Sequence, residues 1–491
     1  MTANGDSIKK NTGAEKQHAF DVVEKNAKAV ALLNDSIFYF GELGLEEHET
    51  VGLVSGLLAK EGFTVETGIS GFPTGMMATY GSGGPVIAIH TECDANPENS
   101  QAAGATAQNP ITPGAPGHCE GHNSNAAVMV AGAIAIKRAM EKFALPGRLK
   151  VFIAPAEEQL LSRPYFVRDG YFADVDCAFH DHIGGDFSTT YGITHSGLVS
   201  AKFIFHGESV HAATAPWKGR DALDGVVMMD MGMAQYREHM TPAMRAHRVI
   251  TEGGLQPNVI PARASIWWYF RDSTAEGARL LFEQAKKIAQ GAAMMTNTTM
   301  EVEVLSAVWP VRGNQTLAEL IERNIERVGM PEWTQGEQAF AKKLQASAGL
   351  EPSGLKLAHT PLKGPAVQRA AANDCGDVSW VVPMGRLTFP ANVPDAPFHH
   401  WSAGAALATS IAHKGAVVGA KALAGSVLDI FLDPTIVARA KESFAREIGN
   451  VKYASLLPAD QKPPIDFNRA QMEPWREKMR AHYVKETVEF V

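Results

Sequence analysis

The chain has 491 residues, about three times the length of a typical domain, so its length excludes a small single-domain module. Lys and Arg number 45 against 53 Asp and Glu, which gives a net charge of −8 and no basic stripe that would neutralise a phosphate backbone. Hydrophobic residues make up 45% and charged residues 20% of the chain, which excludes a disordered or fibrous protein. We therefore expect a globular protein of two or more domains that does not bind nucleic acid.

Membrane and secretion signals are not expected in this sequence. The longest notable apolar run, 126–136, is far shorter than the roughly 20 residues of a membrane-spanning helix. The N-terminus is polar and lacks an apolar signal core. The four cysteines are scattered without a C-x-x-C pair, so we expect free thiols rather than disulfides or a structural zinc knuckle. The expected location is the cytoplasm, with no membrane partner.

Helical and strand-like segments alternate in the first part of the chain. Apolar residues at helical spacing predict helices in 20–61 and 125–143, whereas short β-branched runs predict strands at 85–90, 148–154 and 176–182. This order is typical of an α/β sheet covered by helices. Functional residues are then expected where the strands end.

A second type of segment follows residue 200. The runs 201–206, 265–271 and 300–305 are strand-like, and 222–238 and 276–296 are helical. This β–α–β–α–β order within roughly 110 residues predicts a small α+β domain inserted into the larger one. The segment 340–372 is rich in Gly, Pro and Lys without clean periodicity and predicts a long loop with local helix.

Side chains that can bind metal lie in four groups along the sequence. The groups are 117–123, with Glu120 and His122; the pair Glu157 and Glu158; 180–182, with His182; and His399 with His400. Imidazole and carboxylate groups brought together at strand ends can hold one or two divalent ions and leave a coordination position for water.

Each group also has an ordinary structural explanation. A Glu-Glu pair is often solvated surface, and a lone histidine is often a hydrogen-bonded structural residue. Cys119 is explained equally well as a thiolate ligand and as a small buried core residue. The groups together favour a metal site, because two of them lie beside uncharged strand-like runs where unpaired charge would be costly.

The order of these motifs resembles the M20 metallopeptidase and amidohydrolase family, and within it the group of p-aminobenzoyl-glutamate hydrolase subunits. The likeness runs from about residue 20 to about residue 440 and rests on GHCEGHN at 117–123, PAEE at 155–158, GESVHAA at 207–213, Gly253-Gly254 with Pro257-Asn258, DCGDVSW at 374–380 and SIAHKG at 410–415.

The resemblance implies a catalytic domain interrupted by a ferredoxin-like dimerisation domain, and hence a homodimer. With the segment patterns above, we expect the first catalytic part at 1–198, the inserted domain at 199–309 and the second catalytic part at 310–491.

The resemblance also implies roles for individual residues. The expected metal ligands are Glu120, His122, Glu158, His182 and His399. The expected catalytic residues are Glu157 as general base, Asp94 as the carboxylate that orients a ligand, and His211 as the group that reaches an oxyanion. The expected substrate-binding residues are Asn258 and Arg271.

Three departures from the family pattern lie at the expected site. Glu120 stands where the family usually has Cys, Gln159-Leu160 where glycines commonly follow the Glu pair, and Ile183 where a proline often follows the histidine. A carboxylate is a harder ligand than a thiolate, so manganese is favoured and zinc is possible, with one or two ions.

The implied function is metal-dependent hydrolysis of an amide C–N bond in a small carboxylated aromatic substrate. The changed ligands also permit an aromatic aminohydrolase of the 5-nitroanthranilate type, which would release ammonia from an aminoaromatic acid. A third interpretation, from a different class, is a metal-free binding protein on the same fold, in which Glu120 marks a lost metal site.

Overall fold

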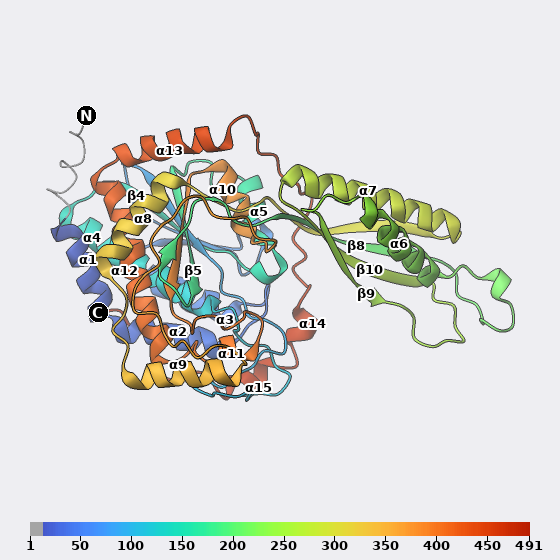
Figure 1. The fold of residues 1–491 in the computed structure, drawn as a ribbon, viewed down its shortest axis with the longest axis horizontal. Coiled ribbons are helices and arrows are strands. Elements are labelled where there is room, and N and C mark those ends of the chain that lie inside the picture. The colour runs from blue at the N-terminus through green and yellow to red at the C-terminus, as the bar shows by residue number, and fades with distance from the viewer. Residues whose placement is uncertain (1–12) are drawn as a thin grey trace.

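A computed structural model describes residues 13–491 (Figure 1). The polar N-terminus considered above lies in residues 1–12, outside the described residues. The strands are β1 (Thr64–Thr67), β2 (Met76–Ser82), β3 (Val86–Thr91), β4 (Gly147–Ile153), β5 (Cys177–Gly184), β6 (Ser188–Thr189), β7 (Gly192–Ile193), β8 (Gly197–His206), β9 (Arg245–Glu252), β10 (Arg263–Asp272), β11 (Thr299–Val308), β12 (Arg312–Gly313) and β13 (Met384–Pro390).

The helices are α1 (Ala14–Lys25), α2 (Ala27–Phe40), α3 (His48–Lys60), α4 (His122–Phe143), α5 (Ser162–Arg168), α6 (Ala222–Tyr236), α7 (Ala275–Met295), α8 (Gln315–Val328), α9 (Gln335–Ser347), α10 (Val378–Val381), α11 (Trp401–Gly404), α12 (Ser410–Leu432), α13 (Thr435–Ile448), α14 (Arg469–Met472) and α15 (Arg476–Arg480). The predicted strands at 85–90, 148–154 and 176–182 correspond to β3, β4 and β5, and the predicted helix at 125–143 corresponds to α4.

The larger domain is built on a seven-stranded mixed sheet with the order β1-β2-β4-β3-β5-β13-β6. Strands β4, β3, β5 and β13 are parallel to one another, whereas β1, β2 and β6 run antiparallel to their neighbours. Apolar side chains of one sheet face pack with α1, α2, α4, α8 and α12 in the main core. The opposite face is covered by α5 and α10. This arrangement confirms the expected α/β sheet covered by helices.

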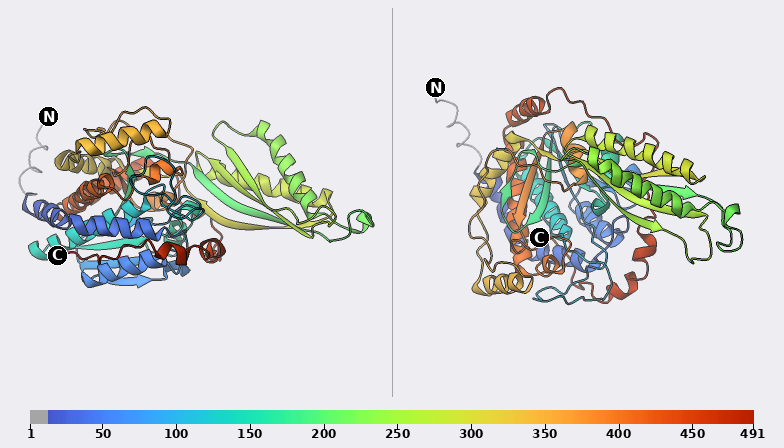
Figure 2. Two further views of the ribbon diagram at one scale, coloured as in Figure 1. Left: turned by 90° about the horizontal axis from the view of Figure 1, so that it is seen from below. Right: turned by 45° about the vertical axis from the view of Figure 1, so that its right-hand side comes forward.

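The smaller domain is a four-stranded antiparallel sheet with the order β11-β8-β10-β9, covered by α6 and α7. The chain order β8-α6-β9-β10-α7-β11 and this strand order are those of a ferredoxin-like domain. Its strands begin at Gly197 and end at Val308, and it projects from one end of the larger domain (Figures 1 and 2). The expected insertion is therefore present.

One strand of this domain was not predicted from the sequence. Strand β9 lies at the sheet edge, and most of its residues are exposed. Polar side chains therefore outnumber apolar ones in it, and the alternation that identifies a half-buried strand is weak. Strand β8, by contrast, lies between β10 and β11 and is more fully buried than its alternating pattern indicated.

The longest apolar helix is α12 rather than the 126–136 segment. By length and composition α12 could cross a membrane, but 72% of its most apolar window is buried inside the protein. It packs on α1, α4 and α8 and contributes Ala420, Leu423 and Val427 to the main core. Its apolar surface is thus satisfied by the fold, as expected for a core helix.

Two helical glycines give a test of how tightly the inserted domain is packed. A Cβ atom at Gly225 in α6 would lie 2.4 Å from the ring of buried Phe205, whereas a Cβ atom at Gly291 in α7 meets nothing within 4 Å. Gly225→Ala is expected to lower the free energy of unfolding by about 1–3 kcal/mol through overpacking. Gly291→Ala is expected to raise it by about 0.5–1 kcal/mol, because alanine loses less backbone entropy in a helix. Denaturant unfolding of both variants measures this; a stabilised Gly225→Ala protein would contradict the packing.

Candidate active site

The candidate site lies where the parallel strands of the large sheet end. Glu92 and Asp94 follow β3, Glu157 and Glu158 follow β4, and His182 lies near the end of β5. His399 comes from the segment after β13, and Glu120 and His122 come from the start of α4. Parallel strands present their carboxyl ends at one edge, so residues far apart in sequence meet there.

The start of α4 depends on a glycine. Gly121 separates Glu120 from His122 and has φ +93°, a left-handed conformation that favours glycine. A Cβ atom there would lie 2.7 Å from Ile183 of β5. The two potential ligands are therefore presented side by side because the chain turns sharply against β5 between them.

The turn after β4 is held in a strained conformation. Ala156 and Leu160 have φ +58° on either side of Glu157–Gln159, which costs about 1 kcal/mol or more at a residue other than glycine. This conformation explains why glycine suits the position of Leu160. The backbone N–H of Ala156 donates to the carboxylate of Glu47 at 2.8 Å, and Glu47 also accepts from the hydroxyl of Thr74 at 2.7 Å. Glu47 thus supports the turn that carries the Glu pair.

The five expected ligand residues come together. His399 Nε2 lies 2.7 Å from Glu120 Oε2 and 3.2 Å from Glu158 Oε2. His182 Nε2 lies 3.8 Å from Glu120 Oε1. Ligand atoms of Glu120, His122 and Glu158 all lie within 4.8 Å of one another. The structure therefore places one compact group of histidines and carboxylates at this edge of the sheet.

The residues of this group fit a divalent metal ion. His122 Nε2 and Glu158 Oε1 are buried and have no hydrogen-bond partner in the described residues. Two unsatisfied buried acceptor atoms in a polar site are costly unless a cation binds them. Carboxylate oxygens and imidazole nitrogens are ligands that manganese and zinc accept. The donor set thus supports metal binding rather than a metal-free site.

The charges of the site also favour a bound cation. Burial and the charge of Glu120 raise the pKa of Glu158 to about 7. Burial alone would lower the pKa of His122, but the hydrogen bond and charge of Asp94 raise it to about 10. The hydrogen bonds to Glu120 and Glu158 raise the pKa of His399 to about 10. The carboxylates therefore hold positive charge strongly at this edge.

Asp94 contacts two of the potential ligands. Its Oδ1 lies 3.1 Å from His122 Nδ1, and its Oδ2 accepts the backbone N–H of Glu158 at 3.0 Å. With Nδ1 engaged in this way, Nε2 of His122 is directed to the metal side as a free acceptor. The geometry is that of a residue that orients a ligand, which is the role expected for Asp94.

Glu157 lies beside the ligand group without belonging to it. Its Oε2 is 3.8 Å from His122 Nε2, and its side chain is buried. Burial and the charges of Glu92 and Glu120 raise the pKa of Glu157 well above its usual value. A carboxyl group with a raised pKa next to a metal site is suited to accept and return a proton.

A buried ion network lies beneath the ligands and was missed in the sequence. The guanidinium of Arg163 donates to both Glu92 and Asp374, and all three side chains are fully buried. Glu92 also lies 3.0 Å from His180 Nε2, and a second group of potential ligands joins Glu92 to His122 and His182. Only the Asp374 motif signalled this network, because a lone arginine in α5 carries no pattern.

Arg271 is the one expected substrate residue that lies near the ligand group in the same chain. It is at the end of β10, where the inserted domain joins the larger one, and its guanidinium lies 5.4 Å from the ring centre of Tyr269. Tyr269 packs with Leu160, next to the Glu pair, in a small apolar cluster. Burial raises the pKa of Tyr269 to about 12, with a further contribution from the charge of Glu158. An apolar wall and a cation thus adjoin the site.

His211 and Asn258 are not brought to this site. They lie together beyond the far end of β8, where the backbone N–H of Ala212 donates to the carbonyl of Asn258 at 3.0 Å, and both are exposed. Strand β8 has ten residues and so places them roughly 30 Å from the junction of the domains. Figure 1 shows the segment between β8 and α6 at the outer end of the molecule. Within one chain these two residues cannot act at the metal group.

Cys119 is a core residue rather than a ligand. It is fully buried, and its thiol lies 2.9 Å from Asn96 Oδ1 as a hydrogen-bond donor. Burial raises the pKa of the thiol, so it does not form a thiolate at neutral pH. The four cysteines of the chain are all free and buried.

Comparisons with known proteins agree with this architecture. Residues 193–294 match the family model of the peptidase dimerisation domain. The chain is 30% identical over 469 residues to one of the two p-aminobenzoyl-glutamate hydrolase subunits of Escherichia coli, covering 90% of this chain and 97% of that protein. It is 27% identical to the Xaa-Arg dipeptidase of Mus musculus, covering 87% and 92%. The structure of the Bacillus subtilis YXEP protein, a dinuclear metal-binding peptidase of the M20 family, aligns with a TM-score of 0.54 and 16% identity over 84% of this chain and 99% of that one.

Replacing the unusual carboxylate tests whether Glu120 binds metal. Glu120→Cys is expected to shift the metal preference from manganese toward zinc, because a thiolate is the softer ligand. Metal content measured after loading with equal manganese and zinc checks this, with Glu98→Gln, an exposed carboxylate nearby in the chain, as the control. Unchanged metal content and preference in Glu120→Cys would show that Glu120 is not a ligand.

Proposed function

Because the chain belongs to the M20 family of metal-dependent peptidases and amidohydrolases, we propose that it hydrolyses an amide C–N bond in a small substrate with a carboxylate and an aromatic ring. The observation that carries the proposal is the position of Glu157, between the ligand group and the wall formed by Tyr269 and Leu160. The relative from Escherichia coli is a hydrolase of p-aminobenzoyl-glutamate, a substrate of this general kind.

The expected ligands are Glu120, His122, Glu158, His182 and His399, and these would hold one or two divalent ions. Oxygen ligands predominate over sulfur, which favours manganese and leaves zinc possible. When bound, the metal polarises the scissile carbonyl and lowers the pKa of the attacking water toward roughly 7.

Glu157 carries the proton transfer in this proposal. Its carboxylate accepts the proton of the attacking water, and the acid so formed returns the proton to the leaving nitrogen. The burial that raises its pKa also keeps bulk water away, so the proton stays within the site. Asp94 keeps His122 oriented and anchors the backbone of Glu158 while this occurs.

Arg271 and Tyr269 are placed to bind the substrate. The planar guanidinium of Arg271 makes a two-point contact with a carboxylate, and its positive charge is not paired with a carboxylate in residues 13–491. Tyr269 and Leu160 provide apolar surface for an aromatic ring beside it.

The active protein is proposed to be a cytoplasmic homodimer. The exposed position of His211 and Asn258 at the outer end of the inserted domain suits residues that act in the site of a second chain. The match of 193–294 to a dimerisation domain supports this assembly. His211 would there stabilise the developing oxyanion, and Asn258 would contact the substrate.

Removing the proposed general base is the direct test of the mechanism. Glu157→Gln is expected to retain the fold and the metal but to lower kcat by about 100-fold or more, because the amide cannot accept the proton. Turnover of N-aroyl amino acids measures this, with Glu98→Gln as the control and ammonia assayed in parallel. Near-normal turnover with full metal removes Glu157 from the mechanism, and ammonia release from aminoaromatic acids would instead identify an aromatic aminohydrolase.

Mixing two inactive variants tests whether His211 acts across the dimer. Glu157→Gln and His211→Ala chains, allowed to exchange, form mixed dimers with one intact site. Random pairing makes half the dimers mixed, so about a quarter of wild-type activity is expected to return. A mixture of Glu157→Gln with His206→Ala, an exposed histidine of the same domain, shows how much activity simple dilution leaves. If no activity returns despite demonstrated exchange, His211 acts in its own chain or outside the reaction.

A further inference from the structure

Two neighbouring segments gather positive charge beside the candidate site. Arg369 and Arg386 have no carboxylate partner in residues 13–491, and the same is true of Arg271 nearby. Arg386 is half-buried, and its Nε is buried without a hydrogen-bond partner. Uncompensated guanidinium groups in a partly buried place are stabilised by an anion.

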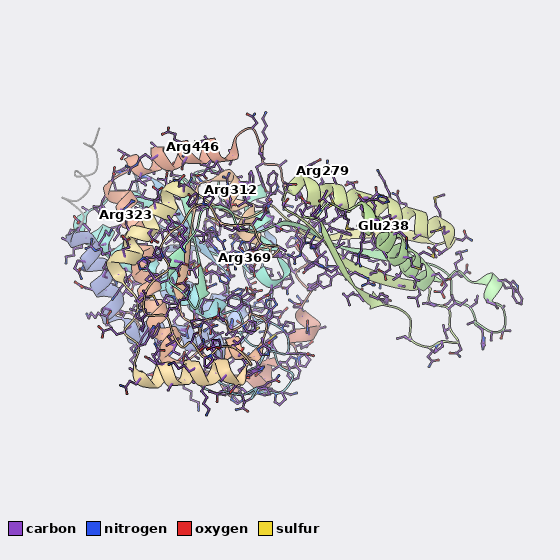
Figure 3. The ribbon with its side chains drawn as sticks, in the orientation of Figure 1. Glu238, Arg279, Arg312, Arg323, Arg369 and Arg446 are labelled. Atoms are coloured by element: carbon purple, nitrogen blue, oxygen red, sulfur yellow. The ribbon has the colours of Figure 1, made fainter. Side chains whose placement is uncertain are left out.

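Backbone and side-chain contacts join these segments to the root of the inserted domain. The backbone N–H of Arg369 donates to the carbonyl of Thr194 at 2.9 Å, and Ser196 donates to Ala371 at 2.8 Å. The side-chain amide of Gln368 donates to His195 at 3.1 Å and to Ser273 just after β10 at 2.8 Å. In Figure 3, Arg369 is labelled between the large sheet and the root of the inserted domain.

His195 is held in one tautomer at this place. Its Nδ1 lies 2.8 Å from the hydroxyl of Thr194 and 3.3 Å from Nη1 of Arg386, which carries only donors. Nδ1 is therefore the acceptor, and Nε2 carries the hydrogen. Burial and the charge of Arg386 lower the pKa of His195 to about 2, so the ring remains a neutral donor. Its Nε2 has no hydrogen-bond partner in the part of the chain that is described.

The cationic segments adjoin the metal ligands. Arg386 of β13 lies in register with His180 of β5, and two residues along, Thr388 lies in register with His182. The charges of His182 and Arg369 both act on His195, which places it between the ligand group and the exposed arginine. An anionic group bound at the metal side of the cleft would thus lie within reach of the same residues.

We propose that His195 and Arg369 form a second anion-binding subsite, with Arg386 positioning His195, and that this subsite takes an acidic group of the substrate other than the one held by Arg271. The inference rests on the proposed function and deepens it. The substrate class is then an acyl or aroyl derivative of an acidic amino acid, in which two carboxylates are bound separately. A substrate with a cationic side chain is disfavoured by the same unpaired arginines.

The test compares substrates that differ by one carboxylate. The wild-type protein is assayed on N-benzoyl-glutamate and N-benzoyl-glutamine, and the ratio of their kcat/KM values is the readout. Arg369→Gln and His195→Phe are each expected to lower this ratio about tenfold or more, while kcat/KM for the glutamine substrate changes little. Arg446→Gln, an exposed arginine on α13 far from the site, removes the same charge and is expected to leave the ratio unchanged (Figure 3). An unchanged ratio in both subsite variants, or equal loss on both substrates, overturns the proposal.

A binding measurement separates this proposal from the proposed reaction. Calorimetric titration of the manganese-loaded protein with glutarate and with butyrate needs no turnover. Arg369→Gln is expected to weaken glutarate binding about tenfold relative to butyrate. If this occurs although neither benzoyl substrate is hydrolysed, the subsite stands and the proposed function fails. If both substrates are hydrolysed but glutarate binds Arg369→Gln as it binds wild type, the function stands and the subsite is wrong.

Discussion

The structure depends on one electrostatic constraint, the gathering of buried carboxylates at one edge of the large sheet. Glu92, Asp94, Glu120, Glu157 and Glu158 lie there, and their mutual repulsion in a place of low polarity would be severe without positive charge. Arg163 supplies a fixed charge from beneath, and His122 and His399 supply charges that a metal ion can replace. The raised pKa values of both histidines express the same constraint.

The surrounding fold keeps these carboxylates in place at a cost. Left-handed backbone at Ala156 and Leu160 and a buried glutamate at position 47 are each unfavourable alone, and all three serve the turn that carries the Glu pair. On the open side the charges are reversed, because Arg271 and Arg369 face the cleft without acidic partners. The site thus joins an anionic interior to a cationic entrance, an arrangement that suits an acidic substrate at a metal centre.

Most of the ligand group could be predicted because its members lie in short motifs at strand ends. Glu120 and His122 flank a glycine that the sharp turn requires, and Glu157 and Glu158 directly follow a strand. The residues that were missed have no such context. Arg163 lies within a short helix, and His195 lies between two short strands, so their neighbours in sequence indicate nothing about the carboxylates or cations that they contact.

The sequence by itself determined the α/β class, the inserted α+β domain and the residues able to bind metal, because local periodicity and motif spacing are properties of neighbouring residues. Only the tertiary structure decided which residues share a site. It joined Arg163 to Glu92 across 71 positions and Arg386 to His195 across 191, and it separated His211 and Asn258 from the ligands of their own chain. These outcomes follow from strand order and domain placement, which depend on the packing of the whole chain rather than on any local pattern.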